Sequence, residues 1–92
     1  MRIPKIASIQ EAVEIYYQNI TLGNKEINAL FGGIGSDKIS ELKKAARAQM
    51  EADSVPSYNG FDVSTISAYK AWGLDINDLT NRYKIMKKVL GG

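Results

Sequence analysis

Apolar residues recur at three- and four-residue intervals in five stretches of this chain. The stripes are Ile9, Ala12, Val13, Tyr16 and Tyr17; Ile27, Leu30 and Phe31; Ile39, Leu42, Ala46 and Met50; Ile66, Tyr69 and Trp72; and Ile76, Leu79, Tyr83, Met86 and Leu90. This spacing places the apolar side chains of each stretch on one face of an α-helix. The pattern therefore predicts five amphipathic helices that pack their stripes together.

Capping residues and glycines indicate where these helices begin and end. Side chains suited to helix starts are Ser8 with Glu11, Asn24, Ser36, Ser64 or Thr65, and Asp75. Gly32-Gly33 should break the second helix, and Gly73 should close the fourth as a left-handed cap. The predicted helices cover about residues 9–19, 24–31, 36–52, 64–72 and 75–90.

The segment between Asp53 and Asp62 contains Pro56 and the Asn59-Gly60 pair. These residues favour a loop or a short β-hairpin near residues 55–63 over a helix. The predicted fold class is all-α: a small bundle of about five helices that contains a helix-turn-helix, in a single domain over residues 1–92. We expect the helix-turn-helix core at about 24–52 and a C-terminal helical pair at about 64–90.

Composition narrows the classes of function. A chain with 45% hydrophobic and 24% charged residues is typical of a globular domain. It has no apolar run near the ~20 residues that cross a bilayer, and Met1 to Lys5 lack the apolar core of a secretory signal, so we expect a cytoplasmic protein without a membrane partner. Because the sequence has no Cys and no His, we expect no enzyme, no cofactor, no metal site and no small-molecule substrate.

Charge is spread unevenly along the chain. The net charge is only +2, but no acidic residue follows Asp78, and the cations after it are Arg82, Lys84, Lys87 and Lys88. Such a basic tail attracts phosphates or an acidic protein surface, although a solvated helix face carries the same pattern.

The stretch from Glu26 to Leu42 has the spacing of a helix-turn-helix. Its expected inward positions are Ile27, Phe31, Ile34, Ile39 and Leu42, with Gly32 at the turn. Two helices that cross steeply over a small core need fixed offsets between buried positions, and a glycine where φ is positive. Two residues depart from the pattern: Gly33 looks like an insertion in the turn, and Asn28 stands where a small residue is usual.

Asn24 to Gly32, followed by Ile39 to Lys43, resembles the helix-turn-helix DNA-binding proteins of Gram-positive bacteria and their phages. The resemblance implies that the second helix of the motif enters the major groove of double-stranded DNA. By this resemblance the residues that face bases are Ser36, Asp37, Lys38, Ser40 and Glu41, and those that reach phosphates are Lys25, Lys44 and Arg47. Ala68 to Asp75 also resembles a segment of small phage-encoded proteins.

The expected function is therefore DNA binding by a homo-oligomer, because single units of this type usually act as dimers on paired half-sites. A transcriptional regulator, an excisionase-like factor and a small terminase-type DNA-recognition subunit remain open as roles.

The alternative is a protein-interaction adaptor in phage assembly or replication. DNA binding requires one continuous positive face formed by Lys25, Lys38, Lys43, Lys44 and Arg47, together with the C-terminal lysines. An adaptor should instead expose an apolar patch.

Overall fold

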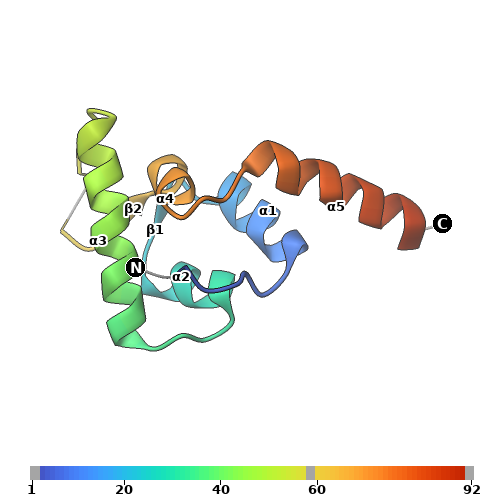
Figure 1. The fold of residues 1–92 in the computed structure, drawn as a ribbon, viewed down its shortest axis with the longest axis horizontal. Coiled ribbons are helices and arrows are strands. Elements are labelled where there is room, and N and C mark those ends of the chain that lie inside the picture. Colours follow the sequence, from blue (N-terminus) through green and yellow to red (C-terminus); the bar gives the residue numbers. More distant parts are fainter. Residues whose placement is uncertain (1–2, 58–59, 91–92) are drawn as a thin grey trace.

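The computed structural model describes residues 3–57 and 60–90. Over these residues the chain forms five helices and two short strands (Figure 1). In chain order they are α1 (Ile9–Gln18), β1 (Thr21–Leu22), α2 (Asn24–Phe31), α3 (Ser36–Ala52), β2 (Val63–Ser64), α4 (Thr65–Ala71) and α5 (Ile76–Leu90). The predicted mainly helical bundle of five helices is confirmed.

Three of the predicted helix starts are correct and two are displaced by one residue. The Ser8 Oγ accepts from the Glu11 N–H at 3.0 Å, Ser64 caps α4, and Asp75 caps α5. The predicted caps Asn24 and Ser36 are instead the first residues of their helices, because a glycine occupies each cap position. Before α2, the Gly23 N–H donates to the Glu26 carboxylate at 3.0 Å.

The strands join two segments that lie far apart in the sequence. They pair antiparallel, with Thr21 opposite Ser64 and Leu22 opposite Val63. The expected hairpin near 55–63 is not formed by residues 55–57 and 60–62, which contain no strand, and residues 58–59 lie outside the described part of the chain. Leu22 and Val63 are both fully buried, so their pairing supplies core contacts that a hairpin in the exposed loop would lack.

One hydrophobic core connects all five helices. Its buried members are Ala12, Val13, Leu22, Ile27, Leu30, Phe31, Ile39, Leu42, Ala46, Met50, Val63, Ala68, Tyr69, Trp72 and Leu79. The Phe31 and Trp72 rings meet edge to face with centroids 5.5 Å apart, which places α2 against α4 in the centre of the molecule.

Three residues of the predicted apolar stripes are exposed instead of buried. Tyr17 is 65% exposed, Ile66 61% and Met86 39%, although all three were expected inside. Met86 lies in the second half of α5, where residues 84–89 are all exposed, and Figure 1 shows that this helix runs back along α1 and then projects beyond it. The Leu90 side chain, also expected inside, lies outside the described part of the structure.

Candidate nucleic-acid interface

Helices α2 and α3 are joined by four residues, three of which are glycines with positive φ. Gly32 ends α2 in the left-handed conformation at φ 74°, as predicted, and Gly35 precedes α3 at φ 81° and ψ 160°. Backbone at the Gly35 angles is accessible almost only to glycine. The chain therefore leaves α2 and enters α3 at a steep angle that Figure 1 shows plainly.

Asn28, which departs from the helix-turn-helix pattern, has a structural role in this connection. Its side-chain oxygen accepts from the Ile34 N–H at 3.0 Å, and its carbonyl oxygen accepts from the Gly33 N–H at 2.9 Å. A smaller residue could not make the side-chain bond. The extra glycine and Asn28 are thus two parts of one longer turn.

The outer face of α3 is uncovered from its first residue. The inward positions are the predicted Ile39, Leu42, Ala46 and Met50, all buried. The opposite side carries the exposed residues Ser36, Asp37, Ser40, Glu41, Lys44 and Arg47. In Figure 1 α3 stands at one edge of the molecule, and Lys25 at the start of α2 is exposed as well.

The remaining two predicted cations are less exposed than Lys25, Lys44 and Arg47. Lys38 is half-buried, and its Nζ lies 3.5 Å from the Glu41 carboxylate. Lys43 is also half-buried; desolvation lowers its pKa, the positive Arg47 lowers it further, and the negative Asp62 and Glu26 oppose this. The two lysines are thus less available to a phosphate than their sequence positions indicated.

The candidate cations do not form the single positive face that DNA binding was expected to require. Lys25, Lys44 and Arg47 are exposed, but Asp37 and Glu41 are exposed on the same helix pair. The C-terminal lysines do not extend this surface, because α5 projects from the opposite end of the molecule (Figure 1). What the structure brings together is an exposed, mixed-charge helix face with three exposed cations, of which Arg47 already donates to the Gly60 carbonyl oxygen at 3.0 Å.

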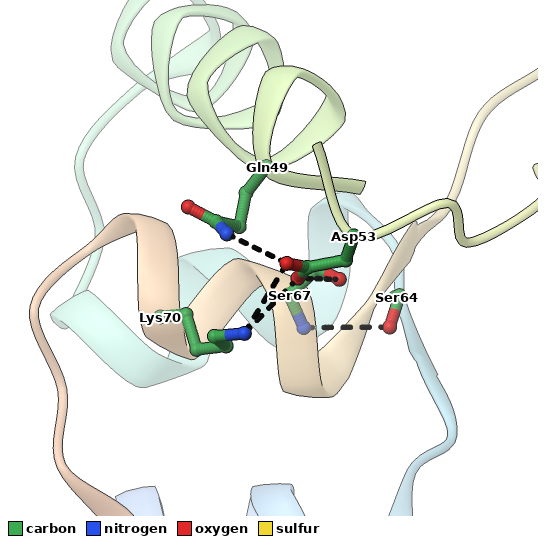
Figure 2. A network of polar contacts seen from close by, with 5 residues as sticks. All are labelled: Gln49, Asp53, Ser64, Ser67 and Lys70. Atoms are coloured by element: carbon green, nitrogen blue, oxygen red, sulfur yellow. Dashed lines mark hydrogen bonds and ion pairs between the residues drawn. The ribbon is translucent and has the colours of Figure 1, made fainter. Parts of the chain in front are cut away.

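The far end of α3 is fixed by a polar network centred on Asp53 (Figure 2). Its carboxylate accepts from the Gln49 amide at 3.0 Å, the Lys70 ammonium at 3.2 Å and the Ser67 hydroxyl at 3.3 Å. Partial burial acts to raise the pKa of Asp53, but these hydrogen bonds and the Lys70 charge outweigh it and leave the pKa below its ordinary value. The network joins α3 to α4.

A second contact holds the middle of α3. The Trp72 indole N–H donates to the Leu42 carbonyl oxygen at 2.9 Å, inside the core. The sequence predicted that Trp72 is buried. It did not predict the two contacts that hold α3, which are the Asp53 network and the bond from Trp72 to Leu42. The four-residue spacing of Gln49 and Asp53 was a visible signal; the partnership with Lys70, across the intervening loop, was not.

A broad, open groove of about 860 Å³ lies on another side of the molecule, where α1 and α3 end and α4 begins. We call it the α1–α4 groove. Its walls include Tyr17, Ile20, Val55 and Ile66, with Asp53 and Lys70 at its polar side. Ile20 is 80% exposed, so this is an apolar surface open to solvent.

A comparison of the chain with protein families, with curated proteins and with solved structures finds no match. Within residues 3–57 and 60–90, none of the helices has the length and apolar character to cross a membrane. The function must therefore be inferred from the residues and their geometry.

Proposed function

We propose that α2 and α3 form a helix-turn-helix that binds double-stranded DNA with the outer face of α3 in the major groove, through a few exposed cations in place of the continuous positive face that the sequence predicted. The observation that supports this most directly is the uncovered first half of α3, presented at a steep angle by the glycine-rich connection after α2. Recognition helices in this class contact base edges with their N-terminal residues, while the preceding helix crosses the backbone.

The exposed side chains of α3 differ in the hydrogen bonds that they can form with DNA bases. Ser36 and Ser40 can donate to or accept from either base class, and Asp37 and Glu41 can accept from the amino group of cytosine. Their negative charge opposes phosphates, so these carboxylates contribute to selectivity and reduce affinity. Lys38, already paired with Glu41, would accompany that carboxylate into the groove.

Affinity comes from Lys25, Lys44 and Arg47, the exposed cations of this surface. With about three phosphates neutralised, the logarithm of the binding constant should fall with the logarithm of salt with a slope of about −2.7. This is a shallow dependence for a DNA-binding protein: raising salt from 50 to 200 mM would weaken binding about 40-fold. Because so few phosphates are contacted, a single copy of the protein should bind DNA weakly.

The test is fluorescence anisotropy of a labelled 30-base-pair random duplex at a series of salt concentrations. In the variant Lys44→Ala/Arg47→Ala, the salt slope should fall by about one for each cation removed. The matched control is Lys87→Ala/Lys88→Ala, which removes the same charge from exposed positions at the other end of the molecule.

The two variants should behave differently if α3 binds the duplex. Equal effects of both would mean that only net charge matters, which contradicts a site on α3. No binding of the wild type at 50 mM salt would refute DNA binding itself, and would leave the protein-interaction adaptor, which the exposed apolar groove favours, as the function.

A further inference from the structure

Residues 60–62 end the loop that follows α3, and they lie beside the exposed side of that helix. The Arg47 Nη2 donates to the Gly60 carbonyl oxygen at 3.0 Å, and Arg47 is itself exposed. In Figure 1 the chain passes back along α3, at the edge of the molecule, before it enters β2. The end of this loop therefore belongs to the same surface as the candidate nucleic-acid interface.

Arg47 continues a line of residues that begins at the first residue of α3. Ser36, Ser40, Lys43 and Arg47 follow one another at intervals of four, three and four residues, so they lie on one side of the helix. In the proposed complex Ser36 and Ser40 meet bases, and Arg47 meets a phosphate. The end of the loop thus lies where this line passes from the bases to the DNA backbone.

Phe61 is presented to solvent between two neighbours that are held in place. It is 77% exposed, and Arg47 binds the carbonyl oxygen of the residue before it. The carboxylate of the next residue, Asp62, accepts from the Thr21 hydroxyl at 3.3 Å. A side chain on a backbone that is fixed in advance has less conformational entropy to lose on binding. The ring of Phe61 is therefore suited to an apolar contact with a partner.

The charged neighbours of Phe61 are compatible with a DNA strand. Asp62 is half-buried, and its carboxylate lies against Gly23, where an added Cβ would stand 3.0 Å from Oδ1, so this acid faces the folded chain. A guanidinium has five N–H donors, and the bond to Gly60 leaves Arg47 with donors for a phosphate. Glu51, one turn beyond Arg47, is exposed and would repel a phosphate, so the contact ends there.

We propose that Phe61 packs its ring against the deoxyribose of the DNA strand whose phosphate Arg47 binds. This inference rests on the proposed function, because it requires α3 in the major groove. Along a DNA strand each phosphate is followed by a sugar with apolar C–H edges, which matches a cation beside an apolar ring. The contact adds affinity without charge, and without sequence preference, because every nucleotide of DNA carries the same sugar. It supplements the few phosphate contacts of a single copy.

The first measurement is the affinity for the labelled 30-base-pair random duplex, by fluorescence anisotropy at a series of salt concentrations. Phe61→Ala should weaken binding roughly five- to tenfold, as burial of part of a phenyl ring implies, and should leave the salt slope unchanged because no charge is removed. Arg47→Ala should instead lower the slope by about one. Phe61→Tyr keeps the ring and should bind as the wild type does.

The matched control is Ile85→Ala, which removes an apolar side chain that is 62% exposed at the other end of the molecule. It should leave binding unchanged. Phe61, Arg47 and Ile85 are all exposed, so the variants should fold, which circular dichroism checks.

The second measurement separates a contact with DNA from an effect on the shape of the loop. Benzoylphenylalanine forms covalent bonds to C–H groups within its reach when it is irradiated. The substitution Phe61→benzoylphenylalanine should therefore cross-link the protein to the duplex, and Ile85→benzoylphenylalanine should not.

Three results would overturn the proposal while DNA binding itself stands. They are a Phe61→Ala variant that binds as tightly as the wild type, an equal loss of affinity in Phe61→Ala and Ile85→Ala, and no cross-link from position 61. A wild type that does not bind at 50 mM salt refutes the proposed function, and this contact with it.

Discussion

The hydroxyl of Tyr69 offers a quantitative test of how the core is held. Tyr69 lies on α4, is 1% exposed, and donates to the Ala12 carbonyl oxygen of α1 at 2.6 Å. Its ring also meets that of Tyr16 at 5.0 Å. The substitution Tyr69→Phe keeps the ring and removes only the hydroxyl, so it isolates this one bond between the two helices.

The expected cost of Tyr69→Phe at neutral pH is modest. A neutral hydrogen bond contributes about 1 kcal/mol net, because water satisfies the same groups in the unfolded chain. The Ala12 carbonyl lies inside α1 and keeps its intrahelical donor, so no buried acceptor is orphaned. For a domain of this size, about 1 kcal/mol lowers the Tm by roughly 4–8 °C. Urea unfolding followed by circular dichroism measures the difference.

The same substitution should change the response to alkaline pH. Burial raises the pKa of Tyr69, and the neighbouring Tyr16 raises it further. The unfolded chain ionises this phenol near its ordinary pKa of about 10, whereas the folded chain keeps it protonated. The contribution of the Tyr69 phenol to the free energy of unfolding is therefore complete below pH 10. It declines as the pH rises above that value, by no more than about 1.4 kcal/mol per pH unit.

The wild type should therefore lose stability faster than Tyr69→Phe between pH 10 and pH 11, and the gap between them should narrow. Tyr17→Phe serves as the control, because Tyr17 is 65% exposed and should show no such convergence. A gap for Tyr69→Phe that is the same at pH 7 and pH 11 would refute the reasoning, since it would mean that the folded protein ionises this phenol as readily as the unfolded chain.

Two further predictions concern the ends of α3. Gly35→Ala should destabilise the fold by about 1–3 kcal/mol, because φ 81° with ψ 160° excludes a Cβ; a Tm equal to that of the wild type would contradict this conformation. Asp53→Asn should lower the Tm at neutral pH by weakening the Lys70 ion pair. Since folding lowers the pKa of Asp53, its contribution is present above the ordinary value of 3.8 and disappears as the pH falls through the lowered pKa. The two Tm values should thus converge in acid, and a constant difference down to pH 2 would exclude the carboxylate as the cause.

The sequence predicted helices well where the apolar stripe extends over several turns. Helix α3 is the clearest case, because four inward positions and a glycine-rich start all indicated the same element. Helix α4 has only seven residues, and there the apolar stripe was misleading. Ile66 is exposed, while Thr65 and Ser67 are each 1% exposed.

Thr65 and Ser67 can be buried because each has a partner from another segment. The Thr65 hydroxyl donates to the Asn19 carbonyl oxygen at 2.7 Å, and the Ser67 hydroxyl donates to Asp53 at 3.3 Å. Buried polar groups are stable when they are hydrogen-bonded, but the partner must be known before burial can be predicted. A pattern within one helix does not contain that information.

The same limit applies to the candidate interface. The exposed positions of α3 followed from its helical period, and the structure confirms Ser36, Ser40 and Lys44 among them. The charges around the α3 lysines could not be predicted in this way, because Lys43 is influenced by Asp62, which comes near it only in the tertiary fold. The two strands could not be predicted either, because two residues are too few to show the alternation of apolar and polar positions that indicates a strand.

The pairing of β1 with β2 has a mechanical consequence. Thr65 extends the pairing, because its N–H donates to the Ile20 carbonyl oxygen at 3.0 Å. The segments by which the chain enters and leaves the α2–α3 region are therefore hydrogen-bonded to each other. A force that pulls Ile20 away from Thr65 acts directly on the Thr21–Ser64 pair. The length of chain stored between residues 23 and 62 is thereby isolated from such tension until that ladder opens.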